Sequence, residues 1–160
     1  MLVAFGCASL ATATACTEVV AETSACKNLE YKDGSVARAQ YLPCAAEMIV
    51  ALDDLDRQTR AALGGDAQAR ADGQATVQRV NALMNAAGGR QLLERWDDRS
   101  FTSLNVSISN AVTKYQAFYM VRILDDSSQF ARASRAAATA EYEGANRRYE
   151  EARQHFRRLH

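Results

Sequence analysis

The chain has 160 residues, 48% of them hydrophobic, with one proline and with 19 basic and 19 acidic side chains. These values fit an ordinary globular protein, and the net charge of zero argues against a protein that coats nucleic acid, which needs a strongly basic face. No apolar stretch reaches the roughly 18 residues that a membrane-spanning helix requires. Alanine and arginine, both strong helix formers, are abundant. We therefore predict an all-α fold and no nucleic-acid partner.

The amino-terminal segment, residues 1–15, has the features of an export signal. It carries no charge and ends in Ala13-Thr14-Ala15, the small-x-small pattern that precedes signal-peptidase cleavage. The next residue is Cys16, and this arrangement resembles the lipobox of bacterial lipoproteins. The resemblance implies a lipid on Cys16 and a membrane tether; cleavage without lipidation stays open, because Ala13 stands where lipoboxes usually carry leucine. We expect a periplasmic or outer-envelope protein, with a cytoplasmic chain as the alternative.

The cysteines are consistent with export. Cys7 would leave with the signal and Cys16 would be lipidated, which leaves Cys26 and Cys44 as an even pair for a disulfide in an oxidising compartment. Closing this loop stabilises a fold by roughly 3 kcal/mol in the chain-entropy account. Residues 16–43 are then a linker followed by a cysteine-bounded loop. No two cysteines have the CxxC spacing of redox or zinc sites.

Residues 44–160 are expected to form a helical bundle. A first amphipathic helix is predicted from about Pro43 to Leu63, because proline is tolerated in the first turn and Gly64-Gly65 follows the last apolar position. Asp66 can cap a second helix that ends at Gly88-Gly89. The two helices are predicted to form an antiparallel hairpin.

The rest of the chain is expected to be helical as well. Residues 90–96 are predicted to form a short helical turn, and helical apolar spacing then continues over 103–160 with only Gly144 to interrupt it. One continuous helix would be roughly 80 Å long. The alternative is a bend at residues 125–128, because aspartate and serine are poor interior helix residues, and we favour this bend. The bundle would then have four helices, with the hairpin packed on a very long or bent carboxyl-terminal helix.

The end of this helix carries a strict apolar seam, in which large and small residues alternate three and four positions apart. Its members are Tyr142, Ala145, Tyr149, Ala152, Phe156 and Leu159. If the seam is not covered by the bundle itself, it is available for self-association or for another protein. We therefore name Tyr142, Tyr149, Phe156 and Leu159 as candidate partner-binding residues.

The sequence offers no catalytic set. The two histidines, His155 and His160, lie at the end of the chain, and Glu151 with His155 alone does not make the ligand set of a bundle metal site. Motifs for acyl transfer, phosphoryl transfer and dinucleotide binding are missing. We predict that the protein is not an enzyme and that it has no cofactor and no metal.

The leading hypothesis is an exported, lipid-anchored helical protein that acts as a structural or interaction module of a bacterial envelope. One alternative is a bundle that binds a small apolar ligand in a cavity between helices. The residues expected to line that cavity are Met84, Trp96, Tyr115, Phe118 and Tyr119. A cytosolic coiled-coil adaptor is the other alternative, and four free thiols would distinguish it.

Overall fold

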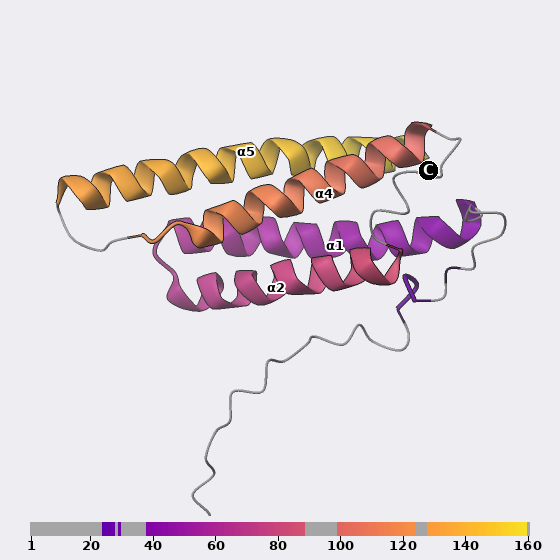
Figure 1. Cartoon of the computed structure of the whole chain (residues 1–160), viewed down its shortest axis with the longest axis horizontal. Coiled ribbons are helices and arrows are strands. Elements are labelled where there is room, and N and C mark those ends of the chain that lie inside the picture. The colour runs from indigo at the N-terminus through magenta and orange to yellow at the C-terminus, as the bar shows by residue number, and fades with distance from the viewer. Residues whose placement is uncertain (1–23, 28, 30–37, 89–98, 124–127, 160) are drawn as a thin grey trace, which may run out of the picture.

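The computed structural model describes residues 24–27, 29, 38–88, 99–123 and 128–159. Every regular element in this part of the chain is a helix, which confirms the all-α fold (Figure 1). The helices are α1 (Arg38–Leu63), α2 (Ala67–Ala86), α4 (Arg99–Met120) and α5 (Gln129–Leu159). The expected export signal, Cys16 and the turn expected at 90–96 lie outside the described residues.

The four helices run alternately up and down and form a bundle (Figure 1). α1 contacts α2, α4 and α5, while α4 contacts both α5 and α2. α2 and α5 therefore occupy opposite corners of the bundle. This is the arrangement that short connections between amphipathic helices favour, and it contains the predicted α1–α2 hairpin.

The core consists of the apolar stripes of all four helices. Its largest fully buried side chains come mainly from α1 and α4: Tyr41, Met48, Leu52, Leu55, Leu83, Leu104, Ile108, Tyr115 and Phe118. α5 contributes mostly small residues, Ala138, Ala145 and Ala152, with Tyr149 and Leu159. Alanine at these positions lets the backbone of α5 approach its neighbours closely. The alternating seam predicted from the sequence is thus the inner face of α5.

The start of α1 differs from the prediction. The helix begins at Arg38, so that Pro43 lies inside it and not in its first turn. Proline has no N–H to donate to the carbonyl four residues earlier, and that residue, Ala39, is exposed, so its carbonyl group is close to solvent. Tyr41 is fully buried, stacks edge-on against Phe101 and donates a hydrogen bond to Asn105. These contacts with α4 account for the extra helical residues.

The turn between α1 and α2 follows the predicted glycine pair. Gly65 adopts a φ of 101°, which glycine reaches without strain. Asp66 then caps α2, because its carboxylate accepts a hydrogen bond of 2.9 Å from the Ala69 N–H. The predicted cap and the tight reversal are both confirmed.

The carboxyl-terminal part is two helices and not one continuous helix. α4 ends at Met120, and α5 begins at Gln129 after a cap in which the Ser128 hydroxyl accepts from the Ala131 N–H at 3.1 Å. α5 then returns along α4 (Figure 1). The prediction of two helices is therefore confirmed and the single continuous helix is wrong, while residues 124–127, where most of the predicted bend falls, lie outside the described residues.

A side chain of α2 binds the carboxyl-terminal end of α4. The Arg70 guanidinium donates Nη2–H bonds to the carbonyl oxygens of Tyr119, at 3.1 Å, and Val121, at 2.5 Å. A cation at a helix C-terminus binds carbonyls that have no partner within the helix and stabilises the helix dipole. Arg70 also lies over the rings of Phe118 and Tyr119. The carboxyl-terminal end of α4 is thus held by a contact between residues about 50 positions apart.

Candidate functional site

The predicted disulfide is present. The sulfur atoms of Cys26 and Cys44 are 2.12 Å apart, and both residues are fully buried. The segment around Cys26 is held to α1 a second time, because the Ser24 hydroxyl donates a hydrogen bond of 2.9 Å to the Glu47 carboxylate. The same hydroxyl accepts from the Cys26 N–H. The chain before α1 is therefore fastened to the second and third turns of that helix.

The four candidate partner-binding residues lie on the inner face of α5. Tyr149 and Leu159 are buried, and Tyr142 and Phe156 are half-buried against the core. Tyr149 donates a hydrogen bond to Asp53 of α1, and Tyr142 accepts one of 3.1 Å from Arg60 of α1. The residues that we expected to meet another protein thus meet helices of their own chain. The physical reason is the bend, which brings the seam back onto the bundle.

A buried carboxylate joins three of the helices. Asp56 of α1 accepts hydrogen bonds from Tyr115 of α4, at 2.9 Å, from Asn146 of α5, at 3.0 Å, and from Arg60 one turn away, at 2.8 Å. Asp56 is only 6% exposed, so these donors replace the water that its charge would otherwise need. Because its oxygens are already occupied by donors of the protein, we assign Asp56 a role in helix register and not in chemistry on a substrate.

The tyrosines around this carboxylate are held in their neutral form. Burial raises the pKa of Tyr115 far above its usual value, and the negative charge of Asp56 raises it further. Burial also raises the pKa of Tyr149, and its hydrogen bond to Asp53 acts in the same direction. A phenol used as a general base near neutral pH needs a lowered pKa, so these groups act as hydrogen-bond donors.

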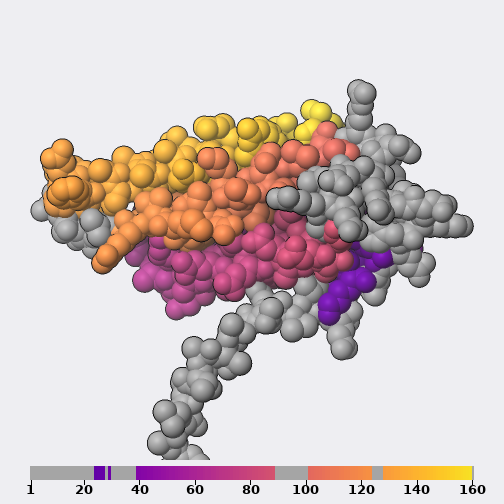
Figure 2. All heavy atoms as spheres, in the orientation of Figure 1, coloured from indigo at the N-terminus to yellow at the C-terminus, as the bar shows by residue number. Residues whose placement is uncertain are grey.

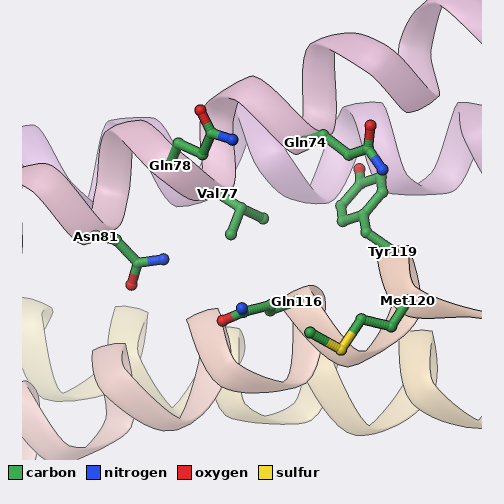
Figure 3. A pocket seen from close by; sticks show the side chains of 7 residues that line it. All are labelled: Gln74, Val77, Gln78, Asn81, Gln116, Tyr119 and Met120. Carbon is green, nitrogen blue, oxygen red and sulfur yellow. The ribbon is translucent and has the colours of Figure 1, made fainter. Parts of the chain in front are cut away.

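A groove between α2 and α4 is the candidate ligand site. Its volume is about 350 Å³, within the range of small-molecule sites. Its lining comes from α2 (Gln74, Val77, Gln78 and Asn81) and from α4 (Gln116, Tyr119 and Met120). Figure 3 shows these side chains gathered around the space between the two helices, with Asn81 and Gln116 on opposite sides. On the space-filling surface, α2 and α4 lie side by side (Figure 2).

The floor of the groove is fixed by Tyr119. Its ring passes over Gly73 of α2, and its hydroxyl lies 2.8 Å from the Thr59 hydroxyl of α1. Thr59 in turn donates to the Leu55 carbonyl oxygen at 2.7 Å, so this hydroxyl has a defined role as donor. Burial raises the pKa of Tyr119 as well, so the phenol stays neutral. Tyr119 therefore links three helices beneath the groove.

The residues expected to form an apolar cavity have a different role. Tyr115 and Phe118 are fully buried in the core, Met84 is half-buried against it, and Trp96 lies outside the described residues. Of the described members of the set, only Tyr119 lines the groove. Sequence reasoning missed the carboxamides of this site, because glutamine and asparagine at polar helix positions look the same whether they face bulk water or a groove.

Among the described side chains, no three of histidine, cysteine, aspartate and glutamate are grouped so as to hold a metal ion. None of the described helices is both long and apolar enough to span a bilayer.

Comparison with known proteins gave no relatives: no family model matches the chain, and neither the curated proteins nor the solved structures contain a significant match.

Proposed function

We propose that the protein is exported and acts as a structural or interaction module of a bacterial cell envelope, tethered by a lipid on Cys16. The observation that carries the proposal is the Cys26–Cys44 disulfide. Disulfides persist in oxidising compartments such as the periplasm and are rare in the cytosol, where thiols are kept reduced. The uncharged leader and the Cys16 lipobox point to the same compartment.

The position of the disulfide also fits a tethered protein. It lies ten residues after Cys16 and joins the segment that follows the tether to the start of α1. Residues 17–25 would then be the spacer between the membrane and the bundle. The cytosolic adaptor is the weaker alternative, because a reducing compartment would open the bond that fastens this segment.

The interaction part of the proposal rests on an exposed end of α5. The inner seam of α5 is occupied by the bundle, whereas Phe130, in its first turn, is 79% exposed. Met120, in the last turn of α4, is 75% exposed. A large apolar side chain with this exposure is accessible to a partner. We propose that association through the carboxyl-terminal helix uses this end, which protrudes in Figure 2.

The intact mass of the protein from a bacterial secreting host tests the export proposal. The protein is alkylated without reductant before the measurement. We expect a chain that lacks residues 1–15, carries acyl groups on Cys16 and keeps Cys26 and Cys44 unalkylated. A cleaved chain without acyl groups would support export and contradict the lipid tether. A full-length chain with four alkylated thiols would overturn the proposal in favour of a cytosolic adaptor.

Sedimentation of purified variants tests the association proposal. Phe130→Ser should weaken self-association at least tenfold if this end of α5 is the contact. Val50→Ser is the matched control, because Val50 is also an exposed apolar residue, at 56%, but lies on α1. Equal loss in both variants would contradict a contact centred on α5. A monomeric wild-type protein would remove self-association and leave a different protein as the partner.

A further inference from the structure

The groove between α2 and α4 is lined by hydrogen-bonding side chains, most of them exposed to solvent, that have no hydrogen-bond partner in the described part of the chain. Four of its seven lining residues are carboxamides: Gln74, Gln78, Asn81 and Gln116. None of these side chains has a hydrogen bond to the described part of the chain. Each presents both a donor NH₂ group and an acceptor oxygen. The groove therefore offers several donors and acceptors to a ligand.

The carboxamides of α2 form a row. Gln74, Gln78 and Asn81 are spaced by four and three residues, so they lie on one face of the helix over roughly 10 Å of its axis. Gln116 faces them from α4 (Figure 3). A ligand in the groove can thus be held from both sides and at more than one point along its length.

The lining carries no charge. All seven residues are neutral, although 24% of the chain is charged. A site for a phosphate, a carboxylate or a cation normally contains a charged partner, because a charge loses hydration when it enters a groove. The nearby cation, Arg70, is not among the lining residues, and its Nη2 donates to the carbonyl oxygens at the end of α4. The ligand that fits is an uncharged one.

The remaining surface is apolar. Val77 is buried at 6% exposure and Tyr119 is fixed to Thr59, so the floor is rigid, while Met120 is 75% exposed at the rim. A thioether side chain is flexible and adapts to the surface it covers. The site thus combines hydrogen-bonding groups on its walls with an apolar floor and an adaptable apolar rim.

We propose that the groove between α2 and α4 binds a neutral saccharide. Sugar hydroxyls donate and accept hydrogen bonds, as carboxamides do, and the C–H face of a pyranose ring is apolar and fits Val77 and Met120. An extended neutral peptide would also meet carboxamides, and it is therefore included as a comparison ligand in the test. The inference is independent of export, since it concerns only the folded bundle.

Side-chain amide resonances in NMR spectra give a direct test. Purified protein is titrated with a panel of neutral sugars that includes N-acetylglucosamine, diacetylchitobiose, maltose and cellobiose. Glucosamine, which is cationic at neutral pH, and a neutral capped hexapeptide are the comparison ligands. We expect saturable shifts of the Gln74, Gln78, Asn81 and Gln116 side-chain signals with at least one neutral sugar.

Paired variants locate the binding. The double substitution Gln78→Ala and Gln116→Ala should lower the affinity for the sugar at least tenfold, because two hydrogen-bonding residues on opposite walls are lost. Asn85→Ala with Asn110→Ala is the control, since both are exposed amides on α2 and α4 outside the groove, and it should leave the affinity unchanged. Circular dichroism checks that each variant is folded.

Four results would overturn the proposal. These are no binding by any neutral sugar of the panel, tighter binding of glucosamine than of its N-acetylated form, binding of the peptide alone, and sugar binding that survives the Gln78 and Gln116 substitutions. The mass measurement proposed above has no influence on any of them, so failure of one proposal leaves the other intact.

Discussion

The phenol of Tyr119 occupies the space that a side chain at position 73 would need. A Cβ atom on Gly73 would lie 1.7 Å from the Tyr119 Oη and 2.4 Å from its Cζ. The absence of a side chain in the middle of α2 is what lets Tyr119 of α4 reach Thr59 of α1. A residue that weakens a helix is here required by the packing of three helices.

Gly73→Ala should destabilise the protein by about 2 kcal/mol, although alanine is the better helix former by roughly 1 kcal/mol. The ring of Tyr119 must move, and the buried hydroxyl of Thr59 loses its contact. Gly144→Ala is the control, since its Cβ would meet only Lys114 atoms at 3.7 and 3.9 Å, and it should stabilise the fold slightly. Urea unfolding measures both changes. Equal effects of the two substitutions would contradict this account of Gly73.

Asp56→Ala should destabilise the fold by about 3 kcal/mol, because the buried Tyr115 hydroxyl and the Asn146 amide lose their acceptor. Combining it with Tyr115→Phe should cost less than the sum of the single changes, as expected for groups in one network. Asp54→Ala, which removes only the exposed pair with Arg57, should cost under about 1 kcal/mol. Additive free energies of unfolding would show that Asp56 and Tyr115 do not act together.

Stability should fall at alkaline pH. The pKa of Tyr115 is raised in the folded state by burial and by Asp56, so above about pH 10 the unfolded chain releases a proton that the folded chain retains. This contribution is complete below the unfolded pKa and is lost at up to about 1.4 kcal/mol per pH unit as the pH rises towards the folded pKa. Urea unfolding between about pH 9 and pH 11 measures the slope.

The matched variant for this titration is Tyr115→Phe. It removes one raised tyrosine, and so its stability should decline less steeply with pH than that of the wild type. Tyr149 and Tyr119, whose pKa values are also raised, remain in both proteins. Parallel pH profiles would mean that the Tyr115 phenol does not determine the alkaline slope.

Reduction of the disulfide should lower the free energy of unfolding by about 3 kcal/mol, as expected for a loop of this length. The loss should be concentrated at the start of α1, because Cys44 lies in its second turn. Amide hydrogen exchange after reduction should therefore increase around Tyr41 more than around Val80 of α2. A uniform increase along the chain would contradict a local effect.

Local signals predicted a large part of the fold. The Gly64-Gly65 stop, the Asp66 cap and the spacing of apolar residues gave the α1–α2 hairpin, and the Asp-Asp-Ser-Ser stretch gave the favoured bend. The pairing of Cys26 with Cys44 followed from counting cysteines. The hairpin and the bend depend on residues that are close in sequence, and the disulfide depends on how many cysteines are available to pair.

The features that the sequence did not predict depend on contacts between distant residues. The binding of Arg70 to the end of α4 and the contact of Tyr41 with Phe101 join different helices. The sequence correctly identified the seam around Tyr149 as an apolar face. Which helices cover that face depends on the path of the chain, and the sequence did not predict it. The groove depends on the distance between α2 and α4, and the helical periodicity of the sequence gives no information on that distance.

The disulfide also determines how a mechanical load would travel through the chain. A pull applied before Cys26 passes through the two sulfur atoms to Cys44 and enters α1 directly. The 17 residues between the cysteines then carry no tension. Force reaches the bundle along a helix that contacts the other three described helices, so extraction of α1 requires the core between them to be broken at once. After reduction, the same pull would first extend the intervening segment.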